Sequence, residues 1–280
     1  MATTSVRRIV LCADDYGISP GVNEAIRSLI AKGRLNATSA MVVAPSLTAA
    51  EATALTGLKR IAPHLQIGLH FTLTAPFRPS SEGYTQLRDD AFLSLPATLG
   101  SALIARLDRD RIAQELRAQI AAFSQTFGFL PDYVDGHQHV QIFPQVRDAV
   151  LAVMRDVLRD AWIRQCGRVT PLTQRVGDAK AMLLDTMSAS LRKRSAASGI
   201  TFNPGFAGAY RFGTDPDFAT LFPTFLDGLP DGGVVMCHPG FVDEELKALD
   251  PLTDLREREH AFLAGDAFPD ILRNQRVTLS

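Results

Sequence analysis

The chain has 280 residues, and its 29 lysines and arginines nearly balance 30 aspartates and glutamates, for a net charge of −1. No broad basic surface is therefore expected to attract nucleic acid or an anionic membrane, and neither is predicted as a partner. Hydrophobic residues make up 46% and charged residues 21%, as in soluble globular proteins. The length suits one α/β barrel, so we predict a single domain over residues 1–280.

The cysteines and the N-terminus bear on where the protein works. Three cysteines, far apart and odd in number, argue against a disulfide framework and favour a reducing compartment. The N-terminal apolar run of four residues is too short for a signal peptide or a membrane span. We therefore expect a cytoplasmic protein with no membrane span. Its oligomeric state stays open, a homo-oligomer included.

Short apolar runs alternate with amphipathic segments through the first half of the chain. Residues 8–13 are predicted to form a buried strand because they are almost all apolar. Ser19 and Pro20 then fit the N-cap and first position of a helix that Gly33 ends. The same criteria predict strands at 38–43, 66–71 and 133–140, and helices at 111–127 and 143–158.

The second half continues the alternation less regularly. Candidate strands are 161–164, 200–203 and 233–237, with helices near 178–198 and 215–227. Strands separated by helices indicate right-handed βαβ units in a parallel sheet. Seven such strands predict a closed or nearly closed α/β barrel, or else a doubly wound sheet. Segments 75–108 and 204–214 fit neither period, so we interpret both as insertions over one face, where loops carry function.

Polar residues able to bind a metal or transfer a proton gather at the ends of these predicted strands. They are Asp14 and Asp15 after the first strand, His70 near the end of the third, Asp135, His137 and His139 on the fourth, and His238 after the seventh. Alternation along the fourth strand would place its three side chains on one face. Active sites of parallel α/β folds form outside the carboxyl ends of the strands, so we expect all seven at one rim.

These residue types suit metal-assisted hydrolysis. Carboxylate and neutral imidazole together bind Zn²⁺, Ni²⁺, Co²⁺ or Mn²⁺, and Mg²⁺ if water fills the remaining positions. Two histidines and one carboxylate leave positions open for water and substrate. The metal lowers the pKa of its water and polarises a carbonyl oxygen, and a second carboxylate nearby can take the proton.

Each signal also has an ordinary structural explanation. A strand-end histidine is often a satisfied polar residue, and paired aspartates such as Asp14 and Asp15 often form a turn or a helix N-cap. His238 stands before Pro239–Gly240 and could open a turn, and His-x-His occurs on exposed edge strands too. The convergence of all these residues on strand ends favours the metal site.

Four motifs carry a family resemblance. They are ADDYGISPGVNEAI (13–26), IGLHFTLT (67–74), YVDGHQHVQIFP (133–144) and MCHPGFVD (236–243). In order, spacing and flanking residues they resemble the YdjC-like carbohydrate deacetylases, a family that includes chitooligosaccharide deacetylases and a hopanoid-biosynthesis branch. The match covers most of the chain. It implies a seven-stranded, barrel-like α/β fold related to the broader polysaccharide deacetylases.

The resemblance also implies roles for particular residues. One divalent ion, Mg²⁺ or Zn²⁺, would be held by Asp15, His70 and His137. Asp14 matches the catalytic base of the family, and His238 matches the acid that protonates the leaving amine.

Other positions match the family less directly. Arg164 matches a recurrent arginine after the fifth strand that faces the site and contacts substrate. The sequence departs from the family at Gln141, where a third histidine is common. Asp135 or His139 would orient a ligand ring in support of the metal.

The sequence thus predicts a metal-dependent hydrolase that removes an N-acetyl group from an amino sugar, a small-molecule substrate. Phe206 and Tyr210, in the 204–214 segment, would offer apolar faces to a sugar ring or, equally, form a hydrophobic plug. The same site could hydrolyse a phosphoester or a cyclic amide. A non-catalytic sugar- or metal-binding protein is the other alternative, although pure binding needs neither both aspartates nor His238.

Overall fold

The computed structural model describes residues 5–168, 179–210 and 217–279. Within these ranges the main sheet has seven parallel strands in the order β7-β6-β3-β2-β1-β9-β8, with β10 paired to β1. Their bounds are β1 Arg7–Tyr16, β2 Ala37–Ala40, β3 Gln66–Phe71, β6 Tyr133–Gly136, β7 Trp162–Ile163, β8 Phe206–Ala207, β9 Gly233–Cys237 and β10 Val277–Thr278. A separate hairpin pairs β4 (Leu87–Arg88) with β5 (Ala91–Phe92).

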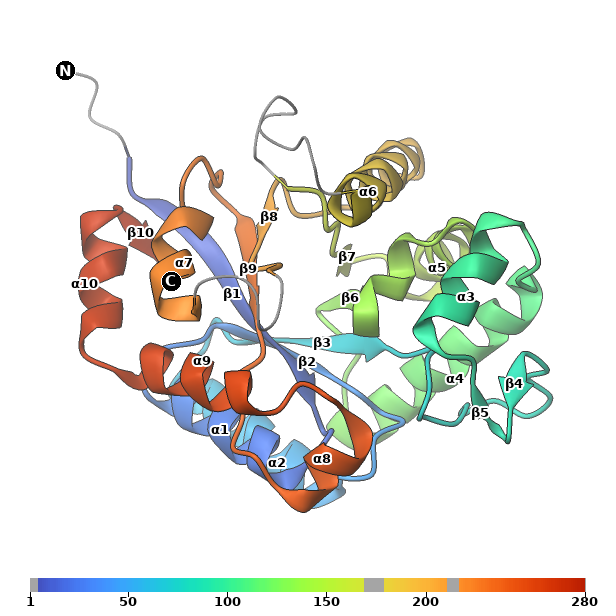
Figure 1. Cartoon of the computed structure of the whole chain (residues 1–280), viewed down its shortest axis with the longest axis horizontal. Helices are drawn as coiled ribbons and strands as arrows, with labels where there is room; N and C mark the ends of the chain where they lie inside the picture. Colours follow the sequence, from blue (N-terminus) through green and yellow to red (C-terminus); the bar gives the residue numbers. More distant parts are fainter. Residues whose placement is uncertain (1–4, 169–178, 211–216, 280) are drawn as a thin grey trace.

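Helices lie around this sheet (Figure 1). They are α1 Pro20–Ala31, α2 Ala49–Gly57, α3 Leu95–Leu103, α4 Arg109–Phe127, α5 Pro144–Val157, α6 Ala179–Ala197, α7 Phe218–Phe225, α8 Glu244–Leu249, α9 Asp254–Ala264 and α10 Ala267–Asn274, with 3₁₀ turns at η1 Leu58–Arg60 and η2 His137–Ile142. None of the helices in the described ranges is long and apolar enough to cross a membrane.

The sheet curves into a half-barrel. Its end strands β7 and β8 do not form a ladder with each other; isolated parallel bridges join Ile163 of β7 to Phe202 before β8, and Arg168 after β7 to Phe206 of β8. The predicted parallel α/β barrel of about seven strands is therefore confirmed, and the doubly wound alternative is wrong.

The strands β1 and β9 pair inside the sheet through apolar residues, Ile9–Ala13 of β1 and all of β9. Their register runs from Ile9 opposite Gly233 to Ala13 opposite Cys237, and all five residues of β9 are buried. A strand buried on both faces is expected to be a continuous apolar run, as both of these are. Because β9 ends at Cys237, opposite Ala13, the residue that follows β9 lies beside Asp14, which is still within β1.

Local signals in the sequence account well for the helix ends. The side chain of Ser19 accepts a hydrogen bond from the backbone N–H of Val22, as expected of the N-cap of α1. Asp108 caps α4 in the same way, and Gly128 ends that helix with a left-handed φ of 81°.

The predicted fourth strand, 133–140, is too long. The strand β6 ends at Gly136, and the chain then forms η2, in which Gln138 and His139 have left-handed φ angles of 54° and 61°. Gln141 folds back onto Gly136, where an added Cβ would lie 2.5 Å from its Oε1. His137 and His139 consequently do not alternate along a strand.

The predicted sixth strand, 200–203, is also misplaced. In that segment only Phe202 makes a single bridge, and the strand is β8, inside the 204–214 segment that the sequence predicts to be an insertion. Pro204 has no N–H to give to a ladder, and the pairing with β9 begins after it, at Phe206. Residues 211–214 of the predicted insertion lie outside the described residues.

Candidate functional site

Three side chains from the carboxyl ends of β1, β3 and β6 meet at one point. Asp15 Oδ1 lies 3.2 Å from His70 Nε2 and 3.1 Å from His137 Nδ1. The two imidazole rings are edge-to-face with centroids 5.5 Å apart. All three side chains are buried, and one donor atom from each lies within 4.8 Å of the others.

A local backbone irregularity brings both aspartates into this site. The pairing of β1 with β2 shifts register between Ala13 and Tyr16, and Asp15 has a φ of 69°. Such a left-handed conformation is uncommon outside glycine, and aspartate is among the residues that adopt it most readily. Strict alternation would send neighbouring side chains to opposite faces. Here Asp14 and Asp15 both end up buried among polar partners.

Asp135 fixes the orientation of His70. The two residues are paired in register on β3 and β6, and Asp135 Oδ1 lies 2.6 Å from His70 Nδ1. The hydroxyl of Ser39 is 3.0 Å from the same nitrogen. Burial alone would lower the pKa of His70, but Asp135 and Asp14 raise it to about 10. The contact turns Nε2, the other ring nitrogen, toward Asp15.

Asp14 is held by Arg164 in a two-pronged ion pair. Nη1 and Nη2 of the guanidinium donate to Oδ1 and Oδ2 at 2.6 and 2.7 Å. Arg164 Nη1 is also 3.0 Å from Asp135 Oδ2, and all three side chains are buried. Burial alone would raise the pKa of Asp14, but Arg164 and then His70 hold it well below its usual range. Asp14 is therefore ionised at neutral pH.

His238 follows β9 and stands next to Asp14 because Cys237 pairs with Ala13. Its charge is among the influences that lower the pKa of Asp14, after Arg164 and His70. The side chain is half-buried, and its backbone N–H donates to Glu259 Oε2. The five residues with the central predicted roles, Asp14, Asp15, His70, His137 and His238, thus lie at the same rim of the barrel.

His139 and Phe206 lie beside this group and contact each other. His139 Nδ1 is 3.5 Å from Cys166 Sγ, and its ring packs edge-on against Phe206. Burial, reinforced by Arg164, lowers the pKa of His139 to about 3, so it is neutral. Phe206 is itself buried, with its ring centroid 5.9 Å from the Arg164 guanidinium carbon. Phe206 therefore packs against Arg164, and His139 packs behind Phe206.

Tyr210, the other predicted substrate contact, is half-buried. Its hydroxyl donates to Glu259 Oε1 at 2.7 Å. Tyr210 therefore reaches the site indirectly, through the carboxylate that also binds the backbone of His238.

Sequence reasoning missed two charged residues of α9. Arg256 Nη2 donates to Asp15 Oδ2 at 2.6 Å, and Glu259 accepts the contacts from His238 and Tyr210. Both side chains are fully buried. The available signal was their i,i+3 spacing, which puts two opposite charges on one helical face. No helix or strand beyond residue 237 is predicted from the sequence, so that spacing pointed to no element.

The donor set of Asp15, His70 and His137 fits a divalent ion. Two imidazoles and one carboxylate are ligands of Zn²⁺ and its neighbours, and a carboxylate behind a ligand histidine is a common support. A second cluster, Cys12, Asp14 and Asp135, is equally compact. It does not fit a cation, because the Arg164 guanidinium already binds both of its carboxylates.

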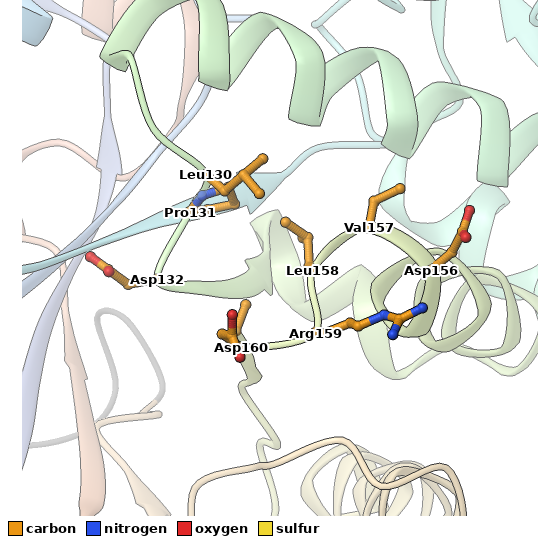
Figure 2. Close-up of a pocket in the computed structure, with 9 residues that line it drawn as sticks. Leu130, Pro131, Asp132, Asp156, Val157, Leu158, Arg159 and Asp160 are labelled. Carbon is orange, nitrogen blue, oxygen red and sulfur yellow. The ribbon is translucent and has the colours of Figure 1, made fainter.

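A surface pocket lies at the other end of the barrel. Figure 2 shows it between the segments that precede β6 and β7, lined by Leu130, Pro131, Asp132, Asp156, Val157, Leu158, Arg159, Asp160 and Ala161. None of the predicted site residues is among them. The two rims of the barrel are thus chemically distinct.

Fold and site together define an α/β-barrel protein with a buried group of residues able to hold a metal ion at its carboxyl rim. The family model for YdjC-like protein matches residues 8–274. The chain belongs to the YdjC-like protein family.

Relatives and solved structures agree with this membership. A Yersinia pestis bv. Antiqua (strain Angola) protein named chitooligosaccharide deacetylase is 29% identical over 247 residues, covering 85% of this chain and 83% of the relative. A Yersinia pseudotuberculosis serotype O:3 (strain YPIII) protein of the same name is 29% identical over 248 residues, with the same coverage. A solved Enterococcus faecalis V583 protein, provisionally assigned to cellobiose-phosphate cleavage, has a TM-score of 0.76 at 19% identity and covers 99% of this chain and 97% of its own. That likeness shows the fold.

Proposed function

We propose that this protein is a divalent-metal-dependent hydrolase that removes the N-acetyl group from an amino-sugar substrate. The observation that carries the proposal is the meeting of Asp15, His70 and His137 beside the Asp14–Arg164 pair. Relatives named chitooligosaccharide deacetylase support an acetylated amino sugar as the substrate.

Asp15, His70 and His137 would hold the ion. His70 presents Nε2 because Asp135 occupies Nδ1, and Asp15 presents Oδ1 to both rings. A divalent ion such as Zn²⁺ or Mg²⁺ would polarise the acetamide carbonyl and lower the pKa of a water molecule. The two nitrogen donors favour Zn²⁺, whereas Mg²⁺ would keep several waters.

Asp14 is the base in this proposal. Arg164 keeps it ionised and fixes its plane, and a carboxylate with about four lone-pair sites can still accept a proton after binding one guanidinium. Asp14 therefore takes a proton from the attacking water, whose oxygen bonds to the acyl carbon.

His238 is the acid. It directly follows Cys237, which is paired with Ala13, the residue before Asp14, so proton acceptor and proton donor come from neighbouring positions on adjacent strands. His238 gives its proton to the amine nitrogen as the C–N bond breaks. Water and amide are thereby converted to acetate and free amine. Glu259 holds the backbone of His238 in place during this transfer.

Acetate release tests the proposal. The native protein, loaded separately with Zn²⁺, Mg²⁺, Mn²⁺ and Co²⁺, is incubated with a panel of N-acetylated sugars that includes N-acetylated chitooligosaccharides. Asp14→Asn should abolish most of the release, and Asp156→Asn, which changes an exposed carboxylate at the opposite rim, should not. Cleavage of p-nitrophenyl phosphate or of a cyclic amide without acetate from any sugar would overturn the proposal.

A further inference from the structure

Arg256 is a buried arginine that reaches the site from outside the barrel. It lies on α9, 241 positions after Asp15 in the sequence, and has no exposed surface. Its Nη2 donates to Asp15 Oδ2 at 2.6 Å and to Asp250 Oδ2 at 3.0 Å, and its Nε donates to the carbonyl of Leu252 at 2.9 Å. Asp250 and Leu252 precede α9, so the guanidinium is anchored on its own segment before it meets Asp15.

This contact divides the two oxygens of Asp15 between different partners. Oδ2 binds Arg256, and Oδ1 faces the nitrogens of His70 and His137. The carboxylate is thus fixed in rotation, with one oxygen directed at the two rings.

We propose that Arg256 is a positioning residue of the metal centre, which restricts Asp15 to a single ligand oxygen. The inference rests on the proposed function, because it concerns the same metal ligands. A free carboxylate can bind a cation through one oxygen or through both. A catalytic site needs positions left over for water and substrate, and a second bond from Asp15 would use one of them.

The surroundings of Arg256 argue against a purely structural ion pair. Its Nη1 is buried without a hydrogen-bond partner, and such a group lowers the stability of the folded protein. Replacing a buried ion pair by apolar side chains is often neutral or stabilising, so burial of the pair is weak support for a stabilising role. A role in orienting Asp15 explains why an arginine is buried at this position, which a contribution to folding stability does not explain.

The same helix supports the other half of the site. Glu259, one turn beyond Arg256, accepts the backbone N–H of His238, and the carbonyl of Arg256 accepts the N–H of Gly240. The helix α9 therefore contacts both the metal carboxylate and the loop of the acid histidine. The position of α9 against the barrel therefore fixes both Asp15 and the backbone of His238.

Cobalt substitution provides a test that does not depend on turnover. The visible spectrum of bound Co²⁺ reports ligand number and geometry and needs no substrate. The variants are Arg256→Met, which removes the donor, and Arg256→Lys, which keeps a charge without the planar fork. Arg147→Met is the matched control, because Arg147 is a buried arginine of α5 whose guanidinium binds Asp148 and Ser190 in place of a proposed metal ligand.

We expect Arg256→Met to bind Co²⁺ with a shifted and weaker absorption band, as the ligand number rises, and Arg256→Lys to show a smaller shift. Turnover should fall by about 10- to 100-fold in Arg256→Met with KM nearly unchanged, the size typical of groups that orient a ligand. Arg147→Met should keep the native spectrum. A native spectrum in Arg256→Met, or in Arg256→Lys if the methionine variant does not fold, would overturn the inference.

The outcome separates this inference from the proposed function. A native protein that binds no divalent cation would overturn both. A native protein that binds Co²⁺ but releases no acetate would overturn the deacetylase, while the spectra of the Arg256 variants would still decide the positioning role.

Discussion

Two ion pairs of equal length mark the two rims of the barrel. At the carboxyl rim Arg164 and Asp14 are 2.6 Å apart with side chains 0% and 3% exposed. At the amino rim, beside the pocket of Figure 2, Arg117 and Asp156 are also 2.6 Å apart but 46% and 60% exposed. The two ion pairs therefore differ in burial and not in length. An exposed pair contributes little, whereas a buried one fixes protonation and geometry for the groups around it.

The largest loss of metal and activity should separate two histidine variants at opposite ends of β3. His70 lies near its carboxyl end, and the exposed His64 precedes its amino end. His70→Ala should lose bound metal and all measurable activity together, because one of three protein ligands is gone. His64→Ala should keep both. Metal content by mass spectrometry and acetate release decide the comparison, and full metal stoichiometry in His70→Ala would remove His70 from the ligand set.

The next effect separates the two adjacent aspartates. Asp14→Asn should retain the metal yet lose about 10²–10⁴-fold in turnover, the usual contribution of a positioned base. Asp15→Asn should weaken metal binding, because an amide oxygen is a poorer ligand than a carboxylate. Metal titration and turnover are measured on both. Loss of metal in Asp14→Asn with retention in Asp15→Asn would reverse the assignment.

A smaller effect is expected from the carboxylates of α9. Glu259→Gln should lower turnover about 10-fold with the metal intact and KM unchanged, because the loop of His238 loses its charged anchor. Asp254→Asn is the control, since Asp254 lies on the same helix but is exposed and accepts a hydrogen bond from the hydroxyl of Thr253. Equal turnover in the two variants would show that Glu259 does not position His238.

In the metal-free protein, the buried His70 should make the free energy of unfolding depend on pH. The pKa of His70 is raised to about 10 from a usual value near 6.5. Its contribution to stability is therefore complete below about pH 6.5 and is lost as the pH rises toward 10. Melting temperatures of metal-free protein should fall over this range, and the fall should be shallower in His70→Gln. An identical slope in that variant would contradict the assignment.

The smallest change should come from breaking the exposed ion pair at the amino rim. Asp156→Asn should reduce the free energy of unfolding by about 1 kcal/mol or less, because water screens the pair with Arg117. Chemical denaturation with and without high salt provides the measurement. A loss of several kcal/mol would mean that the contrast between the rims is not one of burial.

Sequence alone determined the features that depend on local pattern. The strand 66–71 is predicted at its observed bounds, as is 233–237, because an apolar run between polar segments has few other stable arrangements. The order of strands and helices then implies a parallel barrel. Since carboxyl ends of parallel strands share one rim, the positions of Asp15, His70 and His137 along the chain are enough to group them.

Tertiary structure alone decided where the local pattern stops and which distant groups meet. No periodicity indicates that the chain leaves β6 at Gly136, where Gln138 and His139 take left-handed φ angles and Gln141 packs against that glycine. The backbone shift at Asp15 likewise depends on pairing with β2. Arg256 joins Asp15 across 241 positions, and a contact of that span follows from how a C-terminal helix docks on the barrel, which no short stretch of sequence encodes.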